Sequence, residues 1–216
     1  MSETFFIPDV AIVSDGQSHT NSPAGNAIPD VLARKLGVPH HNSGIGGWSW
    51  TTLLDNQAEA TSHANRTLRF LNAAQTMVYL MIGGTQDVLD GDTGAQIYAD
   101  HVRAARAARA HRPSGLLIVA CTIPPSDETN PLAFGHFTPA EEAQRVAANA
   151  LILGDAQGAF DLKIDLDVAP FNDPTEVESE VDAGDGTWAI DGVHYSVDGA
   201  EKITTTLIYP VVKAAL

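Results

Sequence analysis

Short apolar runs alternate along the chain with longer stretches in which apolar residues recur at helical spacing. Residues 76–82 form the strongest run, and residues 10–13 and 116–122 are similar. Runs of this length, rich in β-branched side chains, predict buried strands. Weaker runs at 38–42 and 160–166 predict two further strands of the same sheet.

Helices are predicted between these strands. Periodicity and capping residues predict five helical segments: 26–36, 48–71, 94–111, 138–153 and 197–214. The first would begin at Asn26 as N-cap and end at Gly37. The second is expected in two pieces that meet near Asn56, and the last is expected to bend at Pro210. The helix at 138–153 has the clearest start, because Thr138 can cap it, Pro139 suits its first position and Glu141 lies in its first turn. The polar and glycine-containing segments are predicted to be loops: 43–47, 83–87, 123–138 and 167–186.

Strand and helix alternate throughout the chain, without internal repeats, low-complexity segments or a linker. Such alternation is typical of a parallel sheet with right-handed crossovers and helices on both faces. We therefore expect an α/β fold, a three-layer α/β/α sandwich of the flavodoxin-like kind with a central parallel sheet of about five strands. Residues 1–216 are expected to form a single domain.

Composition and charge narrow the class of protein. The 216 residues are 44% hydrophobic and 18% charged, which suffices for a sizeable core. A formal net charge of −15 and a pI near 4.6 argue against nucleic acid and anionic membranes as partners, because both attract basic surfaces. The single cysteine, Cys121, ends an apolar run and is predicted to be a buried structural thiol.

Targeting signals are not visible. Met1–Thr4 carry no basic cluster and no long apolar stretch follows, so no secretory signal is expected. No apolar run approaches the ~18 residues that a membrane helix needs. We expect a soluble protein, cytoplasmic by default, with extracellular or phage-particle use left open. The sequence does not indicate an oligomeric state.

A candidate nucleophile, Ser18, follows the first predicted strand. Its segment, Gly16–Thr20, would lie at the carboxyl edge of the sheet, where open α/β folds bind their ligands. A serine hydroxyl needs a neighbouring base to take its proton, and His194 is the candidate. Asp191, three residues earlier, could orient the imidazole and stabilise its charged form across a turn made possible by Gly192.

The other histidines have weaker claims to a site. His40 and His41 are adjacent in a predicted strand and therefore point to opposite faces, which disfavours a shared metal ion. His19 is interpreted as local structure beside Ser18. Surface or capping roles are expected for the rest: His63, His101, His111 and His136.

Acyl transfer also needs donors for the developing oxyanion. Gly47 can present an unhindered N–H, Gln86 a side-chain amide and Ser18 its backbone N–H, all from segments after predicted strands. Asp87 is interpreted as a brace for its own loop rather than a catalytic group.

Four segments, in order, resemble the blocks of the SGNH (GDSL-type) esterases and lipases. Residues 16–20 are similar to the Gly-Asp-Ser-Leu-Thr block, 42–47 to the block whose last glycine donates to the oxyanion, 84–87 to Gly-x-Asn-Asp and 191–194 to Asp-x-x-His. The resemblance spans nearly the whole chain. It implies an SGNH hydrolase fold, a triad of Ser18, Asp191 and His194, and an oxyanion hole of Ser18, Gly47 and Gln86. It also implies ester hydrolysis with neither a metal nor an organic cofactor.

Two positions depart from that family pattern. Gln17 stands where the family usually has aspartate, although its carbohydrate acetyl-esterase branch carries a similar Gly-Gln-Ser. A second register would align Ser14–Gly16 with Gly-Asp-Ser and leave no nucleophile, but Thr20 and the strand length favour the first. Gln86 replaces the usual asparagine and is one methylene longer, with the same amide donor.

The expected substrate is a small-molecule or glycan ester with a short acyl group, such as acetyl on a carbohydrate. Gly-Gln-Ser favours it, and so do Trp48 and Trp188 as candidate substrate-binding residues. Core packing is at least as good an interpretation for two of the three tryptophans, the third being Trp50, without the sequence indicating which two. The acidic segment 173–185 could hold Ca²⁺, but without regular ligand spacing a solvated loop is the better interpretation.

Two rival functions remain open. Gln86 suggests a catalytically weak or dead SGNH domain that binds glycans. The Ser/Thr-rich first loop also suits a flavodoxin-like module that binds FMN, and such a protein would be yellow as purified.

Overall fold

The fold is that of a computed structural model, which describes residues 8–20, 27–56, 62–126, 137–169, 171, 195 and 197–216. The elements named below lie within these ranges. Asn26, the predicted cap of the first helix, lies outside them.

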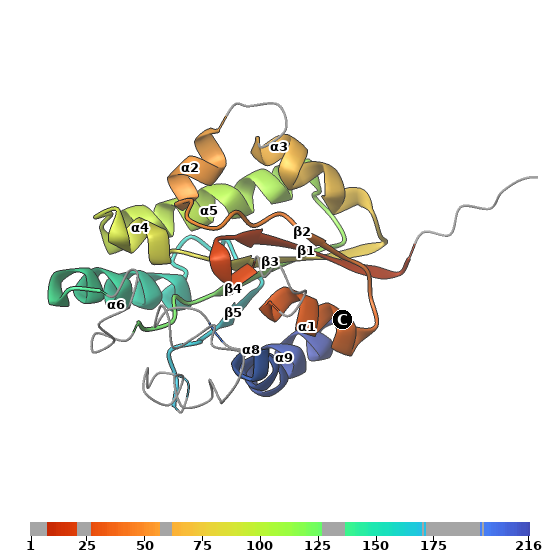
Figure 1. The fold of residues 1–216 in the computed structure, drawn as a ribbon. Helices are drawn as coiled ribbons and strands as arrows, with labels where there is room; N and C mark the ends of the chain where they lie inside the picture. Colours follow the sequence, from red (N-terminus) through yellow and green to blue (C-terminus); the bar gives the residue numbers. More distant parts are fainter. Residues whose placement is uncertain are drawn as a thin grey trace, which may run out of the picture.

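A parallel five-stranded sheet forms the centre of the molecule, in the order β2-β1-β3-β4-β5 (Figure 1). Its strands are β1 (Val10–Gly16), β2 (His40–Asn42), β3 (Thr76–Ile82), β4 (Leu116–Cys121) and β5 (Leu162–Ile164). Helices cover both faces, so the predicted three-layer α/β/α sandwich is confirmed.

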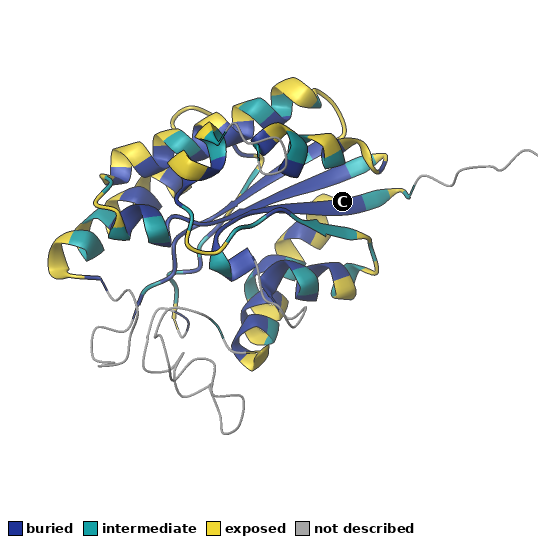
Figure 2. Ribbon diagram, turned by 45° about the horizontal axis from the view of Figure 1, so that its top comes forward, coloured by how far each residue is buried: buried dark blue, intermediate teal, exposed yellow. Residues whose placement is uncertain are grey.

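One face of the sheet is covered by α1 (Ile28–Leu36), α8 (Val197–Ile203) and α9 (Tyr209–Ala215). The other carries α2 (Trp50–Asp55), α3 (His63–Arg66), η2 (Leu68–Asn72), α5 (Gly94–His111) and α6 (Pro139–Gly154). Figure 2 shows the strands buried between these layers and the exposed residues on the outer surfaces of the helices.

The alternating side chains of the strands build a separate core on each face. Met77, Tyr79 and Met81 of β3 join one hydrophobic cluster, and Val78, Leu80 and Ile82 join the other. All six are completely buried. Successive strand residues point to opposite faces, and a strand covered on both faces is apolar throughout. This explains why the apolar run at 76–82 predicted β3 with the correct ends.

Several helix ends follow from local chemistry. Thr138 and Glu141 form a capping box at the start of α6, with Pro139 in its first turn, as predicted. Gly37 ends α1 in the left-handed conformation, with φ of 69°. The predicted helix at 94–111 coincides with α5.

Other elements differ from the prediction. The segment 83–87, predicted as a loop, contains the start of the short helix α4 (Thr85–Leu89), and the fifth strand is shorter than 160–166. The C-terminal helix is irregular at a π-helical segment, Thr204–Ile208, just before Pro210. Tyr209 N–H donates to the Thr204 carbonyl five residues back, a widening that precedes the proline, which has no N–H.

Within the described ranges, no helix is both long enough and apolar enough to cross a membrane.

Candidate active site

The carboxyl ends of β1 and β3 meet at the point where the strand order reverses, the position at which open α/β sheets bind ligands. Gly16 ends β1 opposite Ile82, and Gln17 N–H donates to the Ile82 carbonyl at 3.3 Å. Gly16 has φ of 142°, and a Cβ there would lie 1.8 Å from the Ile82 oxygen. Only glycine permits this close approach.

Ser18 begins a short 3₁₀ turn, Ser18–Thr20, directly after β1. The turn is closed by Thr20, whose N–H and hydroxyl donate to the Gln17 carbonyl at 3.1 and 2.6 Å. Among residues 11–20, all of them described, Ser18 alone is not buried. The fold therefore presents this serine, and covers its neighbours, at the edge where a ligand is expected.

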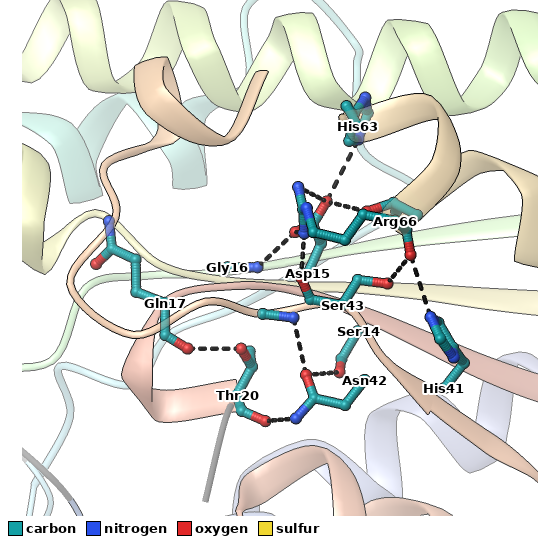
Figure 3. Close-up of polar contacts among 12 residues, drawn as sticks. Ser14, Asp15, Gly16, Gln17, Thr20, His41, Asn42, Ser43, His63 and Arg66 are labelled. Carbon is teal, nitrogen blue, oxygen red and sulfur yellow. Dashed lines mark hydrogen bonds and ion pairs between the residues drawn. The ribbon is translucent and has the colours of Figure 1, made fainter. Parts of the chain in front are cut away.

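The segment after β2 lies against the Ser18 turn. Asn42 donates from Nδ2 to the Thr20 carbonyl and accepts from Gly44 N–H at 2.8 Å, which fixes one segment on the other (Figure 3). A Cβ on Gly44 would collide with the Thr20 hydroxyl, 1.7 Å away, and one on Gly46 would lie 3.8 Å from Ser18 Cβ. Gly47 is exposed, with φ of 75°. The predicted oxyanion donor thus lies on a loop packed beside the predicted nucleophile.

Gln86 lies in the first turn of α4, after β3. Its backbone N–H donates to Gln17 Oε1 at 2.9 Å, which joins α4 to the Ser18 turn. Its side-chain Nε2 donates to Asp90 Oδ1 at 2.8 Å, one helical turn further along. The predicted side-chain donor is half-buried and here binds within its own helix.

Asp87 is completely buried between three segments. Its Oδ1 accepts from Trp50 N–H at 2.8 Å and its Oδ2 accepts from Gln17 Nε2 at 2.6 Å. Burial raises the pKa of Asp87 to about 7, although the N–H groups of Trp50 and Gln17 oppose that rise. Asp87 was expected to brace only its own loop, but it also holds Gln17 and Trp50, which lie in two other segments.

A buried ionic cluster forms around Asp15 of β1 and was not predicted. Asp15 is completely buried, pairs with Arg66 and lies 3.3 Å from His63 Nε2 (Figure 3). It also accepts from the hydroxyls of Thr67 and Tyr79, at 2.9 and 3.1 Å. Burial by itself raises the pKa of Asp15, but His63 and Arg66 outweigh it and hold that pKa below its usual value. A surface or capping role was expected for His63; it is instead buried beside Asp15, so this expectation was wrong.

The ionic cluster also supports the site loops. Arg66 donates to the Ser43 carbonyl, and Ser43 Oγ donates to the Arg66 carbonyl at 2.7 Å. This reciprocal pair links the end of β2 to the same arginine that neutralises Asp15. An aspartate within an apolar strand was the only signal for the cluster in the sequence.

Ser14, His40 and Asp30 have the hydrogen-bond order of a catalytic triad. Ser14 Oγ lies 2.8 Å from His40 Nε2, and His40 Nδ1 lies 3.1 Å from Asp30 Oδ1. Ser14 is nevertheless completely buried within β1, so no substrate can reach its hydroxyl. We interpret this array as a structural link between β1, β2 and α1.

The remaining described histidines have structural contacts. His41 stacks on Phe70, with ring centroids 3.3 Å apart, while its neighbour His40 contacts Ser14 and Asp30 instead. His101 is completely buried, against expectation, because α5 packs its ring 4.8 Å from that of Trp50; burial lowers the pKa of His101 to about 4. His111 contacts Asn72 at the surface, as expected, and His136 lies outside the described residues.

Of the two tryptophans that the structure describes, Trp50 belongs to the core and Trp48 stays a candidate for contact with the substrate. Trp50 is completely buried, and Trp48 is half-buried against the same core. Trp188 lies outside the described residues, and so do Asp191, His194 and the acidic segment 173–185. Tyr195, the residue after His194, is described: its ring centroid is 5.7 Å from that of His19, the residue after Ser18.

Among the residues that the structure describes, no three His, Cys, Asp or Glu side chains are grouped so that they could hold a metal ion.

A family model matches residues 12–202, nearly the whole chain, and shows which class these features define. The chain belongs to the GDSL-like lipase/acylhydrolase family. It is therefore a hydrolase that acts on esters, as the resemblance of its four segments implied. The comparison with curated proteins found no match.

Solved structures support the same fold. A GDSL-like lipase from Bacteroides thetaiotaomicron is 14% identical with a TM-score of 0.57, covering 95% of this chain and 89% of its own. A member of the lipolytic G-D-S-L family from Veillonella parvula is 16% identical with a TM-score of 0.61, covering 91% and 94%. An acetyl esterase mutant with acetate ion is 16% identical with a TM-score of 0.60, covering 96% and 97%.

Proposed function

We propose that this hydrolase is a serine esterase that works through an acyl-enzyme, with Ser18 as the nucleophile. The observation that carries the proposal is the half-buried Ser18 at the meeting point of β1 and β3, beside the Gly47 loop and the start of α4. Ser18 Oγ attacks the ester carbonyl, His194 takes the serine proton and passes it to the departing alcohol, and water then releases the acyl group.

His194 as the base is supported by the contact between Tyr195 and His19. Tyr195 follows His194 and His19 follows Ser18, so the contacting pair joins the two parts of the chain that carry the proposed base and nucleophile. Asp191 is proposed to orient the imidazole.

The proposed oxyanion donors are the N–H groups of Ser18 and Gly47 and the side-chain amide of Gln86. For Gln86 this requires exchanging its bond to Asp90 for one to substrate. A surface side-chain pair four residues apart in a helix is worth only about 0.2–0.5 kcal/mol. A developing negative charge in a dry site binds a donor more strongly than that, so the exchange is favourable.

The proposed substrate is an ester with a short acyl group, in particular acetyl on a carbohydrate. Gly16–Ser18 resembles the Gly-Gln-Ser of carbohydrate acetyl esterases, and Trp48 and Trp188 could stack on a sugar ring. One of the similar structures is an acetyl esterase, which at 16% identity shows a shared fold alone. We therefore choose acetate esters as the first substrates to test. The net charge of −15 disfavours anionic esters.

A series of p-nitrophenyl esters of increasing acyl length, together with acetylated sugars, tests this function. We expect turnover to be highest for the shortest acyl groups and to be lost in Ser18→Ala. Ser14→Ala is the matched control, because it removes a buried serine that also contacts a histidine, and it should retain turnover. Undiminished hydrolysis by folded Ser18→Ala would refute the proposal.

One observation favours a second function. Because Gln86 donates to Asp90, the second candidate is a family member with weak ester hydrolysis whose main role is to bind glycans. Calorimetric binding of acetylated oligosaccharides by wild-type protein that turns over all test esters only slowly would favour this alternative.

A further inference from the structure

Gln17 and Asp87 form a buried hydrogen-bonded pair although they lie 70 positions apart in the sequence. Only 1% of Gln17 and none of Asp87 is exposed, so water does not compete for their polar atoms. Each also accepts a backbone N–H: Gln17 Oε1 accepts from Gln86 N–H, in the same segment as Asp87, and Asp87 Oδ1 accepts from Trp50 N–H, in a third segment. The pair thus joins the Ser18 turn, the start of α2 and the start of α4.

The direction of the central hydrogen bond follows from these neighbours. A backbone N–H can only donate, so the Gln17 atom that faces Gln86 N–H is the oxygen. Gln17 Nε2 therefore faces Asp87 and donates to it. The glutamine supplies one acceptor and one donor, and Asp87 supplies two acceptors.

We propose that Gln17 and Asp87 are positioning residues that hold the three oxyanion-donor segments in one arrangement. The inference rests on the proposed function, because the donors concerned are those assigned there. Gln17 precedes Ser18, Trp50 follows Gly47 by three residues, and Gln86 is itself the third donor. Neither Gln17 nor Asp87 contacts the substrate in this arrangement.

This arrangement also explains why glutamine suits position 17 in this chain. Its amide group supplies a donor, Nε2, to Asp87 and an acceptor, Oε1, to Gln86 N–H. An ionised carboxylate at position 17 could accept from Gln86 N–H but could donate nothing to Asp87.

A reciprocal exchange of the two side chains tests the pair. Gln17→Glu alone places two carboxyl groups face to face, and Asp87→Asn alone places two amide N–H groups face to face. Combining Gln17→Glu with Asp87→Asn restores every bond. The carboxylate introduced at position 17 accepts from Gln86 N–H and from the amide introduced at position 87, and the oxygen of that amide accepts from Trp50 N–H.

Steady-state kinetics of the folded variants gives the first readout. A displacement of about 1 Å in the donors can cost about 10²-fold in rate, so each single variant should lose about that factor in kcat with little change in KM. The double variant should recover most of the loss. Asp155→Asn is the control for a stability effect alone, because Asp155 also accepts buried N–H groups, at Ala159 and Phe160, but after α6.

Amide hydrogen exchange of Trp50 and Gln86 gives a second readout that does not depend on activity. Both amides should lose protection in the single variants and regain it in the double variant. For a wild type that hydrolyses esters, two results would overturn the inference. One is that the single variants keep the wild-type kcat, and the other is that the double variant regains protection without regaining kcat. A wild type that hydrolyses no ester refutes the proposed function instead, and unchanged protection in the single variants would then refute the pairing itself.

Discussion

The buried carboxyl of Asp87 predicts an unusual dependence of stability on pH. The pKa of Asp87 rises from 3.8 to about 7 on folding, and each pKa unit is worth about 1.4 kcal/mol, so ionised Asp87 costs about 4 kcal/mol of folding free energy. Below about pH 4 the group is protonated in both states and contributes nothing. Between about pH 4 and pH 7 only the unfolded state loses its proton, so stability falls as pH rises and then levels off.

Asp87→Asn isolates this contribution because the asparagine does not titrate. The groups that face Asp87 are the N–H groups of Gln17 and Trp50, with Asp92 as the nearby charge that also raises its pKa. Urea unfolding of both proteins between pH 4 and pH 8.5 gives the difference in unfolding free energy at each pH. The wild type should lose about 4 kcal/mol relative to the variant over that range. Parallel profiles for the two proteins would show that the reasoning is wrong.

Three further predictions concern other parts of the structure. Gly16→Ala should destabilise the fold by at least about 2 kcal/mol in urea unfolding, because its Cβ meets a strand carbonyl. Gly37→Ala, where no atom of the described residues lies within 4 Å of the added Cβ, should cost only the left-handed backbone penalty of about 1–2 kcal/mol, and equal losses would contradict the close approach. Arg66→Met should cost about 3–5 kcal/mol in the same assay by leaving buried Asp15 without its guanidinium partner, and a neutral result would show that this ion pair is dispensable. Gln86→Ala should lower kcat by about 10²–10³ with KM little changed, while Gln86→Asn retains activity; wild-type turnover in the alanine variant would leave only the Ser18 and Gly47 N–H groups as donors.

The fold was predictable where local chemistry decides it. The apolar run at 76–82 and the capping box at Thr138 predicted β3 and the start of α6, because strand burial and helix caps depend on neighbouring residues. The positions of Ser18 and Gly47 at one sheet edge followed from the order of strands and loops. The short helix α4 was missed because Gly83–Asp87 has the composition of a turn.

Contacts between distant segments were beyond sequence reasoning. Asp15 meets Arg66 across 51 positions and Gln17 meets Asp87 across 70, and no spacing rule connects such pairs. The burial of His63 depends on that ionic cluster, so its expected surface or capping role was wrong for the same reason. The roles of Asp191 and His194 stay predictions, since they lie outside the described residues.

Peptide mapping after reaction with a fluorophosphonate identifies the nucleophile itself, because this reagent modifies a serine only where a base activates it. We expect a single adduct on Ser18, absent in Ser18→Ala and formed far more slowly in His194→Ala. An adduct on Ser14 or on any other serine, or rapid labelling of Ser18 in the His194→Ala protein, would contradict this expectation.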